Sequence, residues 1–553
     1  MQDTIKQILL RLIIFSIMTC STTLLASNHI KFNDVASIVI ADNLSRLPKN
    51  NFLRELYTHL FFLPAWIEED SPSALSEELF DEIIKDKTLP LSSKLMKKTL
   101  HIMSEVKEMY ARYSKLREKM ELEFKISKLY KEYASYVLYG KINWTSFKSK
   151  LYSFRKKGIK ADWVTYKPES SPISLLVESF TNDNLTKMLK ESKPTEYHYK
   201  ELEKELYKYL KIANQGGWGH IAVKRNLRPN KSYKNIPALR KRLRKSGDYG
   251  ESNPKGNLYD ASLKKAVIRF QKRHGLLANG VVNKRTYKAL NIPVEVRIKE
   301  IRLNLDRIKW LHQRHAKRHI VINIPSFTLF FEEDAKLLQT MKVVVGKIKK
   351  PTPIFSGTVE TIVLNPSWNI PKSIIRKEMI PKLIKNPNAM AQRGIVIYKS
   401  WSRKAVKING SSVDWSKYRN SKSMPFHFAQ VPGVRNALGK VKFLFPNKFS
   451  VYMHDTPSKH LFKRNIRAFS HGCIRLQKPR ELLKTFATFN ASVDFKRSQK
   501  RLKGRSKAYL KLDNPVPVDI VYLTAYVDYD GVLQFRDDIY GYDKMQLQSY
   551  KNW

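Results

Sequence analysis

The stretch that decides both fold and chemistry is YMHDTPSKHLFKRNIRAFSHGCIRL, residues 452–476. In this stretch Cys473 is preceded by His454, nineteen positions before it, and by His471, two positions before it. A thiol is a weak nucleophile at neutral pH until a base or positive surroundings form the thiolate. Because a loop of this length can join two adjacent strands, it can bring the imidazole of His454 beside the sulfur. The spacing therefore predicts a cysteine nucleophile with His454 as its general base.

The residues around the cysteine suggest how a reaction would be supported. Residues two apart in an extended chain face the same way, so His471 is expected to line the same pocket as Cys473. Gly472 has no Cβ, which lets the backbone bend and approach a substrate carbonyl. We expect the N–H groups of Gly472 and Cys473 to form an oxyanion hole. Arg475 is expected to meet a substrate carboxylate or to brace the loop.

Two other interpretations of the same residues stay open on spacing alone. The first is a zinc site formed by His454, His471 and Cys473, with or without Asp455, although the usual spaced pairs of zinc ligands are absent. The second is an inert buried thiol beside histidines that only pack in the core.

The N-terminal segment, residues 1–26, predicts a signal peptide or a membrane anchor. Basic residues stand before or within an apolar run that is shorter than a comfortable membrane span, and Ala26 is a plausible cleavage residue. Export to the periplasm is expected in either case, with membrane contact only through this segment. The chain has two cysteines, and loss of the leader with Cys20 would leave Cys473 as its single thiol, which forms no internal disulfide.

Length and charge set limits on the rest of the chain. At 553 residues, two to four domains are expected. The net charge of +53 draws polyanions, and anionic envelope polymers are the expected class. No motif for specific nucleic-acid recognition is present. The densest basic run, Lys496 to Lys507, is predicted to be a solvated loop.

Periodicity predicts a multidomain α+β protein. Residues 27–230 are mainly helical, and residues 231–292 form a small helical unit whose main helix is capped by Asp260. A connecting helix is expected within 293–318. From residue 319 to 553, period-two apolar runs predict a β-rich domain, interrupted at about 376–432 by a helical, polar insertion. A hairpin with Asp530-Gly531 at its turn is expected near the C-terminus.

The segment 452–476 resembles the YkuD-type L,D-transpeptidases. Their pattern is a His, a gap, then Ser/Thr-His-Gly-Cys with Asn or Arg two residues after the Cys. The pattern stands here as His454 and SHGCIR, residues 470–475. The larger YcbB-like subgroup is the closer match, and the resemblance covers most of the chain. It implies a helical scaffold domain, a peptidoglycan-binding domain that includes IPALRKRLRKSGDY, and a catalytic domain whose insertion is a capping subdomain.

The resemblance also implies roles for the site residues. Cys473 is the nucleophile, His454 is the general base, and the backbone carbonyl of Asp455 holds the imidazole tautomer. The residues implied to support the site or form the oxyanion hole are Gly472, His471, Asp455 and Arg475. Those implied to bind substrate are Tyr452, Trp368 and Ser470.

The implied reaction is a two-step acyl transfer on peptidoglycan peptide stems. Cys473 attacks the carbonyl of the third residue of a donor tetrapeptide, D-Ala leaves, and an amine of a second stem resolves the thioester into a 3→3 cross-link. This chemistry uses no metal and no cofactor. Two rivals remain: an L,D-carboxypeptidase or hydrolase of the same fold, acting on stems or on attached protein, and a non-catalytic wall-binding scaffold.

Overall fold

The computed structural model describes residues 31–222, 225–250, 256–313, 316–402, 404–421 and 423–550. The expected leader and Cys20 lie outside these residues. The described chain divides into two compact units, each considered by itself. The first comprises the described residues up to Asp86 with Leu91–Ala134 and Ser171–Lys190, and the second comprises Lys87–Pro90, Ser135–Ser170 and the described residues from Glu191 onward. Among the described helices, none has the length and apolar character needed to cross a membrane.

The first unit is helical, as predicted. Several of its helices begin at a serine or asparagine whose side chain accepts a backbone N–H, such as Ser73 and Ser93. A buried carboxylate, Glu123, accepts three backbone N–H groups from residues 65–67 and the Tyr57 hydroxyl, and so ties a loop to a helix. The helices are α2 Phe32–Ser45, α3 Phe52–His59, α4 Ala74–Lys85, α5 Lys94–Tyr110, α6 Leu116–Tyr139, α8 Pro172–Asn182 and α9 Leu185–Glu191, with the ends of α6 and α9 extending into the second unit.

The second unit opens with helices that precede the sheet. These are α7 Trp144–Lys156, α10 Tyr199–Asn214, α11 Ile236–Lys245, α12 Ala261–Arg273, α13 Lys284–Leu290 and α14 Val294–Ile308. Asp260 caps α12 by accepting the N–H of Leu263 at 2.7 Å, as its sequence position predicted. Helices α11 to α13 share a small apolar core that includes Leu239, Phe270 and Tyr287, so the predicted helical unit folds around its own interior.

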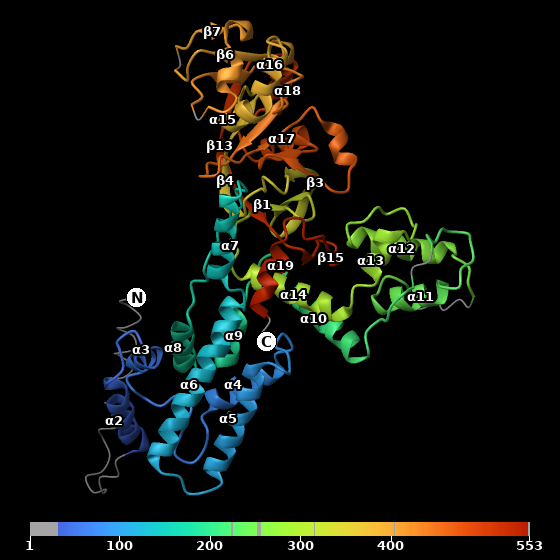
Figure 1. Cartoon of the computed structure of the whole chain (residues 1–553). Coiled ribbons are helices and arrows are strands. Elements are labelled where there is room, and N and C mark those ends of the chain that lie inside the picture. Colours follow the sequence, from blue (N-terminus) through green and yellow to red (C-terminus); the bar gives the residue numbers. More distant parts are fainter. Residues whose placement is uncertain are drawn as a thin grey trace. The chain divides into compact units, whose positions relative to one another are not determined.

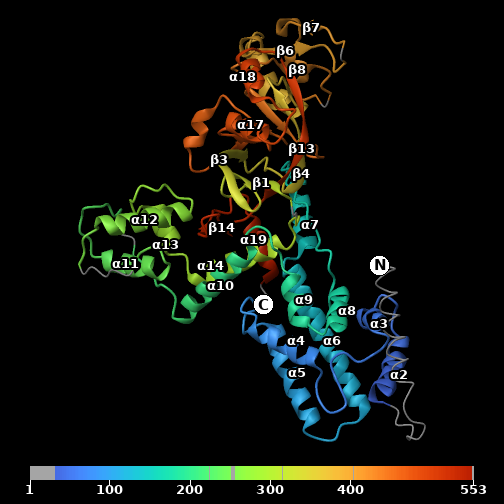
Figure 2. The same cartoon turned by 180° about the vertical axis from the view of Figure 1, so that it is seen from behind.

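The β-rich part holds a nine-stranded sheet. Its strands β1, β3, β4 and β13 are labelled in Figure 1. Its order is β11-β3-β12-β10-β9-β4-β13-β1-β2, and an additional pairing of β2 with β3 closes eight of these strands into a ring. Strands β4 and β13 pair antiparallel over most of their lengths (Figure 2). The strands are β1 Arg318–Asn323, β2 Thr328–Glu333, β3 Lys336–Gly346, β4 Phe355–Leu364, β9 Val441–Leu444, β10 Met453–His454, β11 Ala468–Ser470, β12 Ile474–Leu476 and β13 Ala508–Val521.

The insertion is not purely helical, contrary to the sequence prediction. It holds a second sheet of four short strands in the order β5-β8-β6-β7, with Ile395, Ile397 and Phe428 in an apolar core of its own. Strands β6 and β7 and helix α16 lie together in Figure 1. The elements are β5 Trp368–Asn369, α15 Lys372–Ile374, the π-helical turn η1 Ile375–Met379, α16 Ile380–Lys385, η2 Ala391–Arg393, β6 Ile395–Tyr398, β7 Lys407–Ile408, η3 Gly410–Ser412, η4 Trp415–Tyr418 and β8 His427–Gln430. The apolar pattern of the sequence does not reveal these strands, because each is only two to four residues long.

The C-terminal part corrects one prediction and confirms another. Most of the basic run is helical, contrary to the prediction of a loop, because Asp494 caps the start of a helix that ends at Lys503 and buries Leu502 on one face; residues 504–507 lie outside the helix. The predicted hairpin is present as β14 paired with β15, with Gly531 at a φ of +72° in its turn. The remaining elements are η5 Lys459–Lys463, α17 Pro479–Ala487, α18 Phe495–Lys503, β14 Ala525–Val527, β15 Leu533–Phe535, α19 Tyr542–Gln546 and η6 Leu547–Tyr550.

Candidate active site

Strand register brings the predicted residues onto one face of the sheet. Strand β10 is parallel to β12, with Met453 opposite Ile474 and His454 opposite Arg475. Met453 and Ile474 are fully buried in the sheet core. Because side chains alternate between faces, His454 and Arg475 point to the other face. One step back in the same register, Tyr452 lies opposite Cys473, and the Ile474 N–H donates to the Tyr452 carbonyl at 3.1 Å.

His454 is a buried imidazole in its neutral form. Its ring is 5% exposed, and Nδ1 lies 2.5 Å from the backbone carbonyl oxygen of Asp455. A carbonyl oxygen only accepts hydrogen bonds, so Nδ1 carries the proton and Nε2 has the free lone pair. Burial, with a further contribution from Arg475, lowers the pKa of His454 to about 3. The ring is therefore a proton acceptor at Nε2 throughout the neutral pH range.

Cys473 is a half-buried free thiol. Its sulfur lies 3.8 Å from the Ser450 carbonyl oxygen. Burial raises the pKa of Cys473, while contacts with Tyr452 and the positive charges of Lys442 and Arg475 act in the opposite direction. In the described part of the chain no hydrogen bond joins this thiol to His454. The resting pair is thus a protonated thiol and a neutral imidazole on the same face of neighbouring strands.

The turn before the cysteine departs from the expected arrangement of donors. The Gly472 N–H donates to the Ser470 hydroxyl at 3.1 Å, and that hydroxyl donates to the Cys473 carbonyl at 2.6 Å. The N–H of Gly472 is therefore occupied, and among the described residues the Cys473 N–H has no such acceptor. Ser470 is buried and braces the turn, and its contact with substrate stays a prediction. Gly472 has a φ of +120°, a conformation that favours glycine.

His471 binds the insertion instead of facing the cysteine along an extended chain. Its Nε2 donates to Glu378 Oε1 at 2.6 Å, and Glu378 lies in η1. The chain bends sharply at Gly472, so His471 and Cys473 do not alternate as they would in an extended strand, and the expectation that both face the same way does not apply. Burial lowers the pKa of His471, and the Glu378 carboxylate opposes that shift. The residue connects the cysteine turn to the insertion.

Asp455 and Arg475 occupy different environments. The Asp455 carboxylate accepts the N–H groups of Lys440 at 2.9 Å and Thr456 at 2.7 Å, and pairs with Lys459 at 2.6 Å. These bonds fix the chain that carries the carbonyl partner of His454. Arg475 is half-buried on the site face, and its Nε has no hydrogen-bond partner. The Arg475 guanidinium is therefore placed to meet an anion there.

Tyr452 and Trp368 lie close to the thiol. Burial, and then the neighbouring Cys473 thiol, raise the pKa of the Tyr452 hydroxyl, while Trp368 acts in the opposite direction. The Tyr452 ring also packs edge-on to His454, with ring centroids 5.6 Å apart. Trp368 is partly buried against the core of the insertion. Both aromatic residues therefore belong to the surroundings of the nucleophile.

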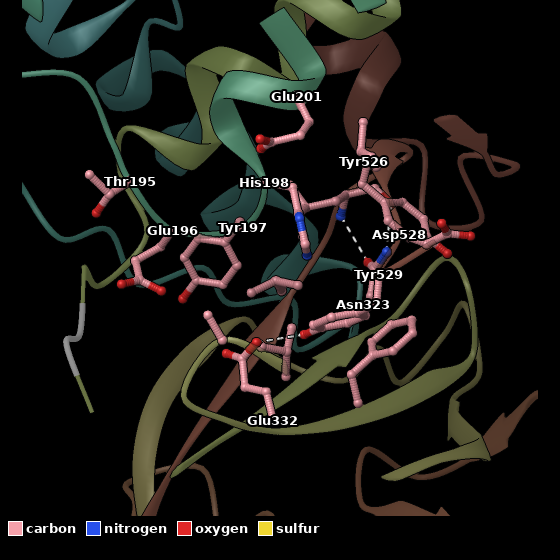
Figure 3. Close-up of a pocket in the computed structure, with 16 residues that line it drawn as sticks. Thr195, Glu196, Tyr197, His198, Glu201, Asn323, Glu332, Tyr526, Asp528 and Tyr529 are labelled. Atoms are coloured by element: carbon pink, nitrogen blue, oxygen red, sulfur yellow. Dashed lines mark hydrogen bonds between the residues drawn. The ribbon is translucent and has the colours of Figure 1, made fainter. Parts of the chain in front are cut away.

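A separate pocket lies elsewhere on the same unit (Figure 3). It has a volume of about 160 Å³ and is lined by aromatic and acidic side chains, with the Tyr529 hydroxyl bonded to Glu332 at 2.8 Å. Beside it, His319 lies between Glu332 at 2.9 Å and Asp519 at 2.5 Å. Burial opposes the charged form of His319, but the two carboxylates raise its pKa to about 9. We interpret this group as a buried ion-pair network.

The zinc alternative finds no support in the arrangement of side chains. In the described residues, the one group of potential ligands with converging donor atoms is Glu196, His319 and Glu332. Both ring nitrogens of His319 already bond to carboxylates. His454, His471 and Cys473 form no such group within the described chain, and the His471 ring is bound to Glu378.

Three residues near the site were not predicted. Lys442 lies on β9 opposite His454, Glu378 binds His471, and Thr352 donates to the Gly472 carbonyl at 2.8 Å. Strand alternation could have identified Lys442, because its neighbour Phe443 is fully buried and the lysine must face the other way. Glu378 and Thr352 are distant in sequence, and no local signal marks them.

Three family matches agree with this architecture. Residues 317–495 match the family described as "L,D-transpeptidase catalytic domain" (YkuD), residues 51–206 match "Scaffold domain", and residues 232–290 match "Putative peptidoglycan binding domain". The chain therefore carries a YkuD-type L,D-transpeptidase catalytic domain together with a scaffold domain and a peptidoglycan-binding domain. The predicted family and fold class are confirmed, while the YcbB-like subgroup stays a prediction.

Individual relatives are more distant. A protein of Haemophilus influenzae named "Putative L,D-transpeptidase" is 29% identical over 255 residues, which are 46% of this chain and 50% of that protein. The chain thus spans about half the length of the curated relative it matches. An L,D-transpeptidase structure from Stackebrandtia nassauensis is 15% identical with a TM-score of 0.21, covering 55% of this chain and 96% of that one. One from Mycobacterium smegmatis is 14% identical with a TM-score of 0.18, covering 37% and 59%. These TM-scores are too low to support any inference about this chain from the two structures.

Proposed function

We propose that this protein is a periplasmic L,D-transpeptidase that forms 3→3 cross-links in peptidoglycan through a Cys473 thioester. The observation that carries the proposal is the shared face of β10 and β12, where a free thiol and a neutral imidazole stand with Tyr452 and Arg475. A cysteine and a base with an unprotonated nitrogen are the minimum requirement for nucleophilic acyl transfer.

In the first half-reaction His454 Nε2 accepts the thiol proton as the Cys473 sulfur attacks the carbonyl carbon of the third residue of a donor stem. The tetrahedral oxyanion is stabilised by the Cys473 N–H, which has no acceptor among the described residues. The C–N bond to the terminal D-Ala then breaks, and the leaving amine takes the proton from His454. A thioester remains on Cys473.

In the second half-reaction an amine of another stem attacks the thioester carbonyl. His454 takes the proton of that amine, the C–S bond breaks, and the cysteine sulfur leaves as a thiolate that recovers the proton. The cross-linked stem is the product. Water in place of the amine would give only a shortened stem. The Glu378–His471 bond ties the insertion to the turn before Cys473, where the insertion would limit the access of water.

The remaining domains fit the same substrate. The domain at residues 232–290 supports binding to peptidoglycan, which would hold the catalytic domain near its stems. The chain's net charge of +53 adds attraction to anionic envelope polymers. No specific nucleic-acid partner is proposed, and any membrane contact is assigned to the N-terminal segment.

The test is incubation of the purified protein with disaccharide tetrapeptides, followed by mass analysis of protein and products. A protein adduct of tripeptide mass on Cys473, together with cross-linked dimers, would support the proposal. Tripeptides without dimers would mean hydrolysis, and an unmodified protein with unchanged muropeptides would favour the non-catalytic scaffold. Cys473→Ala is the control, because the variant retains the surrounding face but has no sulfur.

A further inference from the structure

Lys442 is placed on the catalytic face by strand register. Strand β9 runs antiparallel to β10, with Lys442 opposite His454 and Phe443 opposite Met453. Phe443 and Met453 are fully buried in the sheet core. Because paired residues share a face, Lys442 projects to the same side as His454 and Cys473.

The ammonium group of Lys442 lies against an aromatic ring rather than a carboxylate. Its Nζ is 3.7 Å from the centroid of the Tyr452 ring, a close cation–π contact. Among the described residues no ion pair includes Lys442. Burial lowers the pKa of Lys442, and the proximity of Cys473 opposes that shift. The structure thus keeps a half-buried cation near the thiol without a neutralising partner.

Tyr452 lies between this cation and the sulfur. It stands opposite Cys473 one step back in the parallel register of β10 and β12, and its ring makes the contact with Lys442. Burial is the main cause that raises the pKa of the Tyr452 hydroxyl, and the proximity of Cys473 raises it further. An ammonium group and a phenol O–H both interact more favourably with a negative sulfur than with a neutral thiol.

Lys442 and Arg475 contribute differently to the face. Arg475 lies opposite His454 on β12 and is the leading charged group that lowers the pKa of His454. Lys442 lies on the other side of β10 and packs against the ring of Tyr452. Both cations lower the pKa of His454 and oppose the raised pKa of Cys473, but Lys442 is the one that contacts the Tyr452 ring opposite Cys473.

We propose that Lys442, with the Tyr452 ring it packs against, is the positioning residue that stabilises the Cys473 thiolate. The idea rests on the proposed function, since it assumes that Cys473 is the nucleophile. Proton transfer to His454 leaves an imidazolium and a thiolate, and Lys442 and the Tyr452 hydroxyl then face the thiolate. Tyr452 consequently acts on the nucleophile, a role distinct from the substrate groove expected from the sequence.

The experiment measures the ionisation of the thiol directly. The rate of Cys473 alkylation by iodoacetamide is followed against pH by peptide-resolved mass spectrometry on the full chain, without any peptidoglycan substrate. The Lys442→Met variant is expected to raise the midpoint by about one pH unit, because an attractive charge near the sulfur is lost. Lys442→Arg keeps the charge and is expected to restore most of that shift. Tyr452→Phe removes the hydroxyl and is also expected to raise the midpoint.

The matched control is Lys448→Met, which removes an exposed lysine whose Nζ lies 5.4 Å from the Phe449 ring. This variant is expected to leave the midpoint unchanged. Thermal unfolding of each variant checks that the fold is retained. An unchanged midpoint in folded Lys442→Met would overturn the inference. A shifted midpoint in a protein that never forms a thioester with a donor stem would support the inference and refute the proposed function, so the two failures are distinguishable.

Discussion

Two buried histidines on the same sheet have opposite charge states. His319 on β1 is 2% exposed and His454 on β10 is 5% exposed, so burial alone predicts that both are neutral. The pKa of His319 is nevertheless raised to about 9, whereas that of His454 is lowered to about 3. The difference comes from their partners: two carboxylates bind the ring of His319, while His454 has a carbonyl oxygen and two nearby cations.

The comparison separates a structural histidine from a chemical one. His319 has both ring nitrogens bonded to carboxylates, so it has no free lone pair with which to act as a base. His454 uses only Nδ1 in its recorded hydrogen bond, and Nε2 keeps a lone pair. His319 therefore cannot act as a base, because carboxylates bind both of its ring nitrogens. His454 can act as a base, because its Nε2 is free to accept a proton.

Removal of the base should produce the largest effect. His454→Ala is expected to lower the rate of thioester formation from a donor stem by about 10³-fold, because the variant lacks the imidazole nitrogen that is proposed to accept the thiol proton. Intact-mass measurement of the adduct over time gives the rate. His101→Ala, which changes an exposed histidine, is the control. A loss smaller than about tenfold would remove His454 from its proposed role.

His319→Gln should act on stability instead. The folded-state pKa of about 9 lies above the ordinary value of 6.5, so the protonated ring stabilises the fold fully below pH 6.5, and that stabilisation is lost as pH rises through 9. The variant is expected to lose on the order of 3 kcal/mol of unfolding free energy in mildly acidic solution, and to approach the wild type in alkaline solution. Denaturant unfolding across this pH range measures the difference, with His101→Gln as the control. A pH-independent difference would contradict the ion-pair interpretation.

His454 should contribute a pH dependence of the opposite sign. Its folded-state pKa of about 3 lies below the ordinary 6.5, so the unfolded chain binds a proton that the folded protein does not. The folded state is thus increasingly penalised as pH falls below 6.5 toward 3.

Much of this site could be predicted from sequence because its central residues are close in the chain. The quoted segment holds the thiol, the imidazole, Tyr452 and Arg475, and strand alternation is enough to place them on one face. The helix start at Asp260 and the C-terminal hairpin were equally local, since a cap and a turn depend on a few neighbouring residues.

What the sequence did not provide depends on distant segments or on exact backbone angles. The Glu378–His471 bond joins residues 93 positions apart, and the bend at Gly472 invalidated the alternation assumed for His471. The sequence could not show that the Gly472 N–H donates to the Ser470 hydroxyl, because that bond depends on the same bend. This N–H was therefore expected in the oxyanion hole. The charge of His319 was unpredictable because Asp519 lies 200 positions away.

Arg475→Met would make the surroundings of His454 less positive and so reduce the contrast between the two rings. Burial is the main cause of the low pKa of His454, and Arg475 is the next. Loss of this cation is expected to raise the pKa of His454 by up to about one unit, still below 6.5. Histidine-resolved NMR titration of the substrate-free protein measures the shift separately from any effect on substrate binding. Arg480→Met, on the exposed side of α17, is the control, and an unchanged pKa would show that Arg475 does not contribute to the low pKa of His454.

Glu378→Gln should have the smallest effect, because Glu378 acts through His471 and is 45% exposed. An exposed pair of this kind contributes little to stability, so the melting temperature is expected to change by only about 1–2 °C. The amide oxygen can still accept from His471, but the charge that favours a protonated ring is lost. If the bond holds the insertion over the thioester, the variant should release more tripeptide relative to cross-linked dimer, by a factor of about two to five. The matched control is Glu481→Gln. It removes a similarly exposed carboxylate on α17, which pairs with Lys478 just before that helix. An unchanged product ratio in Glu378→Gln would mean that the His471 contact has no part in excluding water.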